Sequence, residues 1–437
     1  MNRKIIKPTT LPGFMELIPD EQILFNEMLD IIRYNYEKYG FLPIDTPVME
    51  RAEILLAKGG GETERQVYRF KKGDTDIALR FDLTVPLARY VAQHFSELTF
   101  PFRRYHIGKV YRGERAQRGR FREFYQCDID IIGNGRLDII NDAEIPSIIY
   151  STFKDLGFEN FTIKVNNRKV LKGFFQWLGI ENSIAILRAI DKLEKIGIEK
   201  VRLELEELNV DQDIIGKIVE FIQISGTNEE KLAKLGRLKI ENDIFNEGLD
   251  ELKIVNKYIG AFGVPSDNYA IDLTIARGLD YYTGTVYETF LDNHTDIGSI
   301  CSGGRYDDLA GYYTKQKLPG VGISIGLTRL FYQLYEAKLL EVADVSLTEV
   351  IVIPMEGCLD KAINISNILR DRGISTQIYL EKGRIGKKFG FADKLNIPYV
   401  LLVGMEEIEK DRYTLRDMDT GEQTMLSIEE IISRLKN

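Results

Sequence analysis

Positive charge is concentrated between residues 103 and 122. This stretch holds eight arginine or lysine side chains against a single acid, Glu114. Arg112 and Glu114 are two residues apart, as are Arg120 and Arg122, and residues at that spacing on a strand point to the same face. Because a guanidinium binds phosphate or carboxylate through paired hydrogen bonds, four such groups on neighbouring strands could hold a triphosphate. The alternative is a solvated ladder of cross-strand ion pairs, which contributes little where it is exposed.

Two further segments combine arginine with glycine or tyrosine. In ARGLDYYTG (residues 276–284), Gly278 leaves room for a ligand beside Arg277, and Tyr281 and Tyr282 add hydroxyls and ring faces. Strand alternation alone would instead split the two tyrosines between core and surface. In GVGISIGLTRL (residues 320–330), the glycines allow close backbone approach to a flat ring, and Arg329 follows where it could stack on a base. This segment matches neither the phosphate loop nor the dinucleotide-binding fingerprint.

Composition restricts the remaining chemistry. The three cysteines lie far apart and form no CxxC pair, which excludes a disulfide framework and a zinc site of cysteine type. The three histidines have no paired spacing, so we expect no metal held by side chains. The net charge of −9 argues against nucleic-acid binding, unless the local basic block supplies it. No stretch approaches the roughly 20 apolar residues of a membrane helix, and the start has no apolar signal core.

Apolar spacing and turn residues predict the elements that must position these groups. Residues 19–40 repeat apolar positions at helical spacing and end at Gly40, which predicts a long helix followed by the extended segment FLPIDTPVME. Residues 100–132 alternate and are rich in β-formers, which predicts two antiparallel strands joined by a basic loop. Residues 270–290 predict another hairpin, around Thr283-Gly284. Residues 319–340 predict a glycine-rich strand that leads into an apolar helix.

The length argues for more than one domain. Residues 166–258 carry leucine and isoleucine at helical spacing among many Glu and Lys residues, which predicts a helical insertion. A composition change near 340–348 indicates a linker, and beyond it short apolar strands alternate with helical stretches and end in a hairpin around residues 419–422. We therefore predict an α+β catalytic domain with an antiparallel sheet flanked by helices, over 1–165 and 259–340. The helical insertion occupies 166–258, and an α/β domain occupies 346–437.

Taken in order, these segments resemble the signature of class II aminoacyl-tRNA synthetases. FLPIDTPVME resembles the first class motif, YRGERAQRGRFREF the second and GVGISIGLTRL the third. ARGLDYYTG and CSGGRYDDL resemble the two signature peptides of the histidyl-tRNA synthetase family, and EFYQCDIDIIG and RFDLTVPLAR are similar to that family too. The resemblance covers nearly the whole chain.

The resemblance implies roles for individual residues that match the family's motifs. Arg112 and Arg277 would be catalytic, near the α-phosphate and the carboxylate of histidine. Asp130 is an aspartate where many bacterial members have glutamate. The residues implied for ATP are Arg112, Glu114, Arg120 and Arg329. Those implied for histidine are Asp82, Leu83, Thr84, Arg112, Gln126, Asp130, Arg277, Tyr281, Tyr282 and Tyr306.

The resemblance also implies a reaction in two steps. The carboxylate of histidine attacks the α-phosphorus of ATP, giving histidyl-adenylate and pyrophosphate, and a ribose hydroxyl at the 3′ end of tRNA(His) then attacks the activated carbonyl. ATP would be a substrate accompanied by Mg²⁺, with no organic prosthetic group. The implied partners are tRNA(His), histidine, ATP and a second copy of the chain in a homodimer, with no membrane and a cytoplasmic location.

The C-terminal α/β domain would bind the anticodon stem-loop. Its basic residues, Lys382, Arg384, Lys387 and Lys388, would contact the RNA backbone, and the alternative is a solvated helix start. A second reading of the whole chain is a catalytically silent paralogue that regulates ATP phosphoribosyltransferase in histidine biosynthesis. Such proteins generally lack the anticodon-binding domain and lose ATP-site residues. Both are present here, which favours the enzyme.

Overall fold

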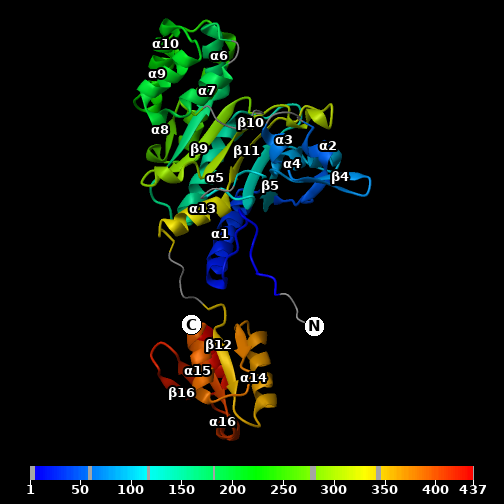
Figure 1. The fold of residues 1–437 in the computed structure, drawn as a ribbon. Coiled ribbons are helices and arrows are strands. Elements are labelled where there is room, and N and C mark those ends of the chain that lie inside the picture. Colours follow the sequence, from blue (N-terminus) through cyan, green and yellow to red (C-terminus); the bar gives the residue numbers. More distant parts are fainter. Residues whose placement is uncertain are drawn as a thin grey trace. The chain divides into compact units, whose positions relative to one another are not determined.

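The computed structural model describes residues 5–57, 62–115, 119–180, 183–275, 282–340 and 346–436 (Figure 1). The chain divides into two compact units. The first comprises Met1–Glu16 and Phe25–Glu341, and the second comprises Leu17–Leu24 and Val342–Asn437. Within the described residues, no helix is both long enough and apolar enough to cross a membrane.

An eight-stranded sheet forms the centre of the first unit, in the order β1-β5-β6-β11-β10-β9-β7-β8. Neighbouring strands are antiparallel except at the two edges, where β1 and β8 run parallel to β5 and β7. The predicted antiparallel pair is confirmed, because β5 and β6 pair along their whole length. The strands are β1 (Leu42–Pro43), β5 (Phe102–Tyr111), β6 (Glu123–Ile132), β7 (Phe161–Asn167), β8 (Tyr269–Ile271), β9 (Thr285–Leu291), β10 (Cys301–Tyr306) and β11 (Gly320–Ile325).

The hairpin predicted over residues 270–290 is wrong. β8 pairs with β7 in parallel and β9 pairs with β7 antiparallel, so β7 lies between them. A hairpin needs a short loop between its strands, and the segment between Ile271 and Thr285 is too long for one. Residue alternation identified two strands here but carried no information about their partner.

Three helices support the strands that carry the site. α1 (Pro19–Lys38) confirms the predicted N-terminal helix, and its Tyr36 hydroxyl donates to the carbonyl oxygen of Cys127 on β6 at 2.9 Å. α13 (Leu327–Glu336) packs against β6 and confirms the predicted strand-to-helix passage, and α5 (Ile140–Asp155) packs against β10 and β11. Phe25 of α1 lies edge-on to Phe331 of α13, with 5.4 Å between ring centroids.

A smaller three-stranded sheet, in the order β2-β4-β3, precedes β5 in the chain. Helix α4 begins directly after it, at the point where Asp82 and Thr84 stand. The elements are β2 (Met49–Arg51), α2 (Ala52–Leu55), α3 (Glu62–Gln66), β3 (Arg69–Lys72), β4 (Thr75–Leu79) and α4 (Thr84–Gln93).

The described residues between β7 and β8 form helices and their connections, as predicted for an insertion. Stacked aromatic rings pack this region, and the ring centroids of Phe174 and Phe221 are 4.0 Å apart. Helices α6 to α10 gather at one end of the first unit (green in Figure 1). The helices are α6 (Arg168–Trp177), α7 (Ile184–Ile190), α8 (Leu193–Ile196), α9 (Ile198–Glu207), α10 (Gln212–Ile222), α11 (Asn228–Arg237) and α12 (Asp243–Ala261), followed by the 3-10 turn η1 (Ser266–Asn268).

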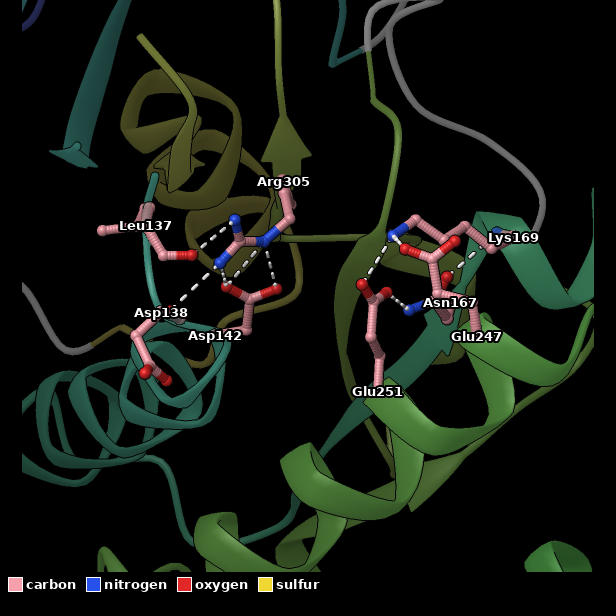
Figure 2. Close-up of polar contacts among 8 residues, drawn as sticks. All are labelled: Leu137, Asp138, Asp142, Asn167, Lys169, Glu247, Glu251 and Arg305. Carbon is pink, nitrogen blue, oxygen red and sulfur yellow. Dashed lines mark hydrogen bonds and ion pairs between the residues drawn. The ribbon is translucent and has the colours of Figure 1, made fainter. Parts of the chain in front are cut away.

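Two polar clusters fasten helices to the sheet (Figure 2). In the first, the Arg305 guanidinium on β10 pairs with the Asp142 carboxylate on α5 at 2.6 Å and also donates to the backbone carbonyls of Leu137 and Asp138. In the second, Lys169 of α6 pairs with Glu247 and Glu251 of α12 at 2.8 and 2.5 Å, and Asn167 at the end of β7 also donates to Glu251 at 2.8 Å. Arg305 and Asp142 are both buried.

The second unit confirms the predicted α/β pattern. β13, β12 and β14 are parallel, and β15 and β16 form the predicted closing hairpin. α14 and α17 pack on one face of this sheet and α15 on the other. The elements are β12 (Val350–Pro354), α14 (Leu359–Asp371), β13 (Thr376–Ile378), α15 (Ile385–Lys394), β14 (Tyr399–Val403), α16 (Met405–Lys410), β15 (Tyr413–Asp417), β16 (Gln423–Leu426) and α17 (Ile428–Lys436).

Candidate functional site

A cavity of about 570 Å³ opens on one face of the large sheet. It extends from β6, β10 and β11 to the segments that follow β5 and precede α4. Ten of the residues predicted to bind ATP or histidine line this one cavity. They are Asp82, Thr84, Arg112, Glu114, Arg120, Gln126, Asp130, Tyr282, Tyr306 and Arg329.

Strand register explains why the polar residues meet. Gln126, Asp128 and Asp130 alternate along β6, so they share a face. Their partners on β11 include Gly322, opposite Asp130, and Ser324, opposite Asp128. A Cβ at Gly322 would overlap both the backbone carbonyl of Ile129 and the carboxylate of Asp130, so glycine is needed for this close approach.

Buried acids form the sheet end of the cavity. Asp130 pairs with the fully buried Arg104 and accepts a hydrogen bond from the Tyr306 hydroxyl at 2.8 Å. Burial raises the pKa of Asp130 to about 6, against the opposing effect of Arg104, and raises the pKa of Asp128 to about 7 in the same way. Burial also raises the pKa of Asp82, although its Oδ1 accepts from the backbone N–H groups of Thr84 and Val85 at 3.1 and 2.9 Å. This end of the cavity therefore favours a ligand that carries positive charge or N–H donors.

Arginines line the same cavity. The Arg112 guanidinium lies over the rings of Phe81 and Phe124, at 4.5 and 5.0 Å from their centroids, and its Nε donates to the carbonyl of Phe81 at 3.1 Å. Arg329 on α13 donates to the carbonyl of Ile297 at 2.9 Å, and burial lowers its pKa. These contacts hold the planar cations in place, as the binding of a polyphosphate requires.

The predicted strand geometry around Arg112 is partly wrong. β5 ends at Tyr111 and β6 begins at Glu123, so Arg112, Glu114, Arg120 and Arg122 lie beyond the paired strands. Glu114 and Arg120 still form an ion pair, at 3.7 Å, beside the cavity. Arg122 donates to the backbone carbonyls of Glu114 and Pro12 at 2.9 and 3.4 Å, so it stabilises the loop and does not line the cavity.

Of the remaining predicted residues, Leu83 is the one that is described and does not line the cavity. Leu83 is fully buried and precedes α4. Arg277 and Tyr281 lie outside the described residues.

Other lining residues were missed from the sequence. Asp128 could have been found, since its spacing from Gln126 and Asp130 places it on their face. Phe124 could have been found in the same way, because it stands two residues before Gln126 on β6. Ser302 and Ser324 gave no such signal, because their places depend on which strands become neighbours. Across the described part of the chain, no group of three or more His, Cys, Asp or Glu side chains could hold a metal ion.

The basic residues predicted for RNA contact lie at the start of α15 in the second unit. Lys382, Arg384 and Lys387 are exposed. Lys388 is partly buried and donates to the carbonyl of Pro354 at 3.0 Å, so its ammonium already has a partner at the end of β12. Three of the four side chains are therefore free to meet solvent or a phosphate backbone.

Comparison with known proteins gives consistent results over the whole chain. The family model described as histidyl-tRNA synthetase matches residues 13–330, and the one described as anticodon binding domain matches residues 349–437. A histidine–tRNA ligase from Clostridium tetani is 63% identical, with 100% of both chains covered. A crystal structure of histidyl-tRNA synthetase from Nostoc sp. PCC 7120 has a TM-score of 0.89 and 41% identity, with 99% of both chains covered.

A more distant structure bears on the alternative that the chain is a catalytically silent regulatory paralogue. It is described as an ATP phosphoribosyltransferase regulatory subunit/histidyl-tRNA synthetase from Bacillus halodurans. Its TM-score is 0.75 at 20% identity, covering 92% of this chain and 99% of that chain. At this identity the likeness concerns the fold alone.

Proposed function

The chain belongs to the histidyl-tRNA synthetase family, and from this membership we infer that it is a histidine–tRNA ligase. It activates histidine with ATP and transfers it to tRNA(His). The observation that carries this conclusion is one cavity that is lined both by buried acids on β6 and by Arg112 and Arg329. A bound amino acid could place its ammonium near the acids and its carboxylate near the arginines. The carboxylate would then lie beside the phosphates of ATP, which the arginines also bind.

Activation needs positioning and charge neutralisation rather than a protein nucleophile. The carboxylate oxygen of histidine attacks the α-phosphorus, and the pyrophosphate leaves with the electron pair of the broken P–O bond. We assign Arg112 to the α-phosphate because two aromatic rings and the Phe81 carbonyl hold its guanidinium in place. Arg329 and Arg120 are assigned to the phosphate tail, and Glu114 to the adenine amine.

Specificity for histidine rests on polar groups at the sheet end of the cavity. Asp130 is assigned to the imidazole, together with Tyr306, which donates to it. Asp82, Thr84, Gln126 and Tyr282 are assigned to the remainder of the amino acid. A buried polar site of this kind rejects side chains that leave its groups unpaired. The resemblance alone supports the roles proposed for Leu83, Arg277 and Tyr281.

Transfer to tRNA engages the second unit. We assign residues 346–437 to anticodon binding, residues 1–165 and 259–340 to catalysis, and residues 166–258 to the helical insertion. Exposed Lys382, Arg384 and Lys387 support a contact with the RNA backbone.

Three further properties belong to the same proposal. ATP enters as its magnesium complex, in which the phosphate oxygens bind the ion. The chain works as a homodimer in the cytoplasm. Large apolar side chains exposed in or near the first class motif, among them Leu42 and Met49, support a self-interface there.

Histidine-dependent exchange of pyrophosphate into ATP tests the activation step. The purified protein should catalyse exchange with histidine and not with other amino acids. The silent regulatory paralogue would catalyse none, so a pure and folded protein without exchange would overturn the enzyme reading. The intact cavity arginines and the second unit favour the enzyme.

A further inference from the structure

The chain forms a tight turn over residues 11–14, before the first helix. The N–H of Phe14 donates to the carbonyl oxygen of Leu11 at 3.1 Å, and Gly13 has a φ of +86°. Pro12 in the second position and Gly13 in the third are typical of a type II β-turn. Proline fixes its φ in advance and glycine adopts the positive φ without strain, so this turn is well defined. The described residues that precede it are exposed, so this segment contributes little to the hydrophobic core.

The turn contacts Arg122, just before β6. The backbone N–H of Arg122 donates to the carbonyl of Gly13 at 2.7 Å, and its Nη1 donates to the carbonyl of Pro12 at 3.4 Å. The same arginine also holds the segment that follows β5. Its Nε donates to the carbonyl of Glu114 at 2.9 Å, and its own carbonyl accepts from the N–H of Arg112 at 2.9 Å. Arg122 therefore links the turn to two residues whose side chains line the cavity.

Glu114 depends on such links because it lies beyond the end of β5. Its carboxylate is 3.7 Å from the guanidinium of Arg120, a long and partly exposed ion pair that contributes little to holding it. On one side its backbone is held through Gly113, whose N–H donates to the carbonyl of Gln66 at 2.6 Å. On the other side it is held by Arg122. The position of the carboxylate thus depends on the backbone contacts around it.

We propose that Arg122 and the turn at residues 11–14 position Glu114, and that they thereby set the selectivity of the enzyme for the amine of adenine. Pro12, Gly13 and Arg122 are not among the described residues that line the cavity, so they act on it through Glu114. The proposal rests on the proposed function, in which Glu114 accepts a hydrogen bond from that amine. It adds a segment near the start of the chain to the determinants of nucleotide selectivity.

Two nucleotides separate this role from general support of the fold. Purine riboside triphosphate is identical to ATP except that it lacks the amine, so it has no contact with Glu114 to lose. The measured quantity is the KM of this analogue divided by the KM of ATP, in histidine-dependent pyrophosphate exchange. For the wild-type protein we expect a ratio on the order of 10, the value of one hydrogen bond to a charged acceptor. Glu114→Ala should bring the ratio close to 1.

Gly13→Ala tests the turn itself. An alanine opposes the positive φ of this position, so the turn loses its geometry and its contacts with Arg122. The ratio should fall roughly 3- to 10-fold, because the KM of ATP rises while that of the analogue does not. The KM of histidine should stay near its wild-type value. A general loss of stability would instead change all three constants together.

Gly157→Ala is the matched control. Gly157 follows α5 and has a φ of +87°, and a Cβ added there meets nothing within 4 Å. The substitution therefore introduces the same backbone strain as Gly13→Ala, but outside the turn and the segment that follows β5. Its ratio should equal that of the wild-type protein.

Arg122→Lys tests the same support from its other side. Lysine keeps the charge but cannot reproduce the two contacts of the guanidinium with Glu114 and Pro12, so the ratio should fall here too. Because both substitutions break one set of contacts, the double variant with Gly13→Ala should show less than the product of the two single effects. A full product would mean that the turn and Arg122 act independently, which contradicts the proposal.

The remaining outcomes separate this proposal from the proposed function. A ratio that stays at the wild-type value in Gly13→Ala, or that falls equally in Gly157→Ala, overturns the role of the turn while the enzyme reading stands. A ratio unchanged in Glu114→Ala overturns the assignment of Glu114 to the adenine amine and this proposal with it. If the wild-type protein shows no histidine-dependent exchange, the proposed function and this proposal are both overturned.

Discussion

Single side chains in this site are held before any ligand arrives. Arg112 lies between two rings and a carbonyl, and Asp130 between Arg104 and Tyr306. Groups fixed in this way need little reorganisation as charge develops on the α-phosphate. Much of the contribution of Arg112 to catalysis should therefore depend on the shape of its side chain and not on its charge alone.

Arg112→Lys tests that dependence on shape. Lysine keeps the charge but loses the planar fork and its stacking, so we expect the exchange rate to fall on the order of 100-fold. The measurement is steady-state ATP–pyrophosphate exchange with ATP varied. Arg115→Lys, at an exposed position of the same loop, serves as the control and should remain near wild type. Equal activity of the two variants would contradict the assigned role of Arg112.

Asp128 also gives the fold a pH dependence. Burial raises its pKa from 3.8 to about 7, so the folded state binds this proton more tightly than the unfolded chain. The stability supplied by the proton is present below about pH 4 and is lost as the pH rises through about 7. Between about pH 5 and about pH 8, the free energy of unfolding of the wild-type protein should fall by roughly 1 to 4 kcal/mol relative to that of Asp128→Asn. Urea denaturation of both proteins measures this, and a difference independent of pH would contradict it.

The sequence predicted which side chains gather at one cavity where spacing and motif position carried the information, and their binding roles stay predictions. Ten predicted residues line one cavity, because motif positions and alternation determine which side chains share a face. Arg122 was misjudged, since spacing cannot show that its guanidinium is used by the carbonyls of Glu114 and Pro12. The partner of Asp128, Ser324, could not be predicted either, because it depends on β11 lying beside β6.

At the level of elements, the site depends on how helices hold β6, β10 and β11. Helix α5 is joined to β10 by the buried pair of Arg305 and Asp142 (Figure 2). Arg305 and Tyr306 are neighbours on β10, and Tyr306 lines the cavity. The ion pair therefore fixes the strand that carries a residue assigned to histidine.

Asp142→Asn tests this support. The change leaves the Arg305 cation buried without its counter-charge, which should cost about 3 to 5 kcal/mol of the free energy of unfolding. Asp138→Asn is the matched control, because Arg305 uses only the backbone carbonyl of Asp138. Urea denaturation that showed equal stability for the two variants would mean that the pair does not hold α5 to the sheet.

Elements were predictable to the extent that their interactions are local. The helix at 19–38 and the strands β5 and β6 followed from periodicity and turn residues. The partner of β9 did not, because β7 reaches it from across the whole helical region. The pairing of strands that are distant in the sequence is decided by which side chains become buried in the complete sheet. A local sequence pattern carries no information about that burial.

For the whole molecule, activation and tRNA recognition should be separable. The second unit has its own hydrophobic cores on both faces of its sheet. Removing residues 346–437 should therefore weaken tRNA charging much more than histidine-dependent exchange. Measuring both rates on the truncated protein checks this. An equal loss of both would indicate that the C-terminal part is needed to stabilise the catalytic part.

The central claim is that this chain activates histidine for tRNA. The most direct measurement is aminoacylation of unfractionated tRNA by the purified wild-type protein, with each of the standard amino acids supplied in turn. The predicted result is ATP-dependent charging with histidine alone, on tRNA(His). Charging with a different amino acid, or none with histidine by a folded protein, would contradict the account.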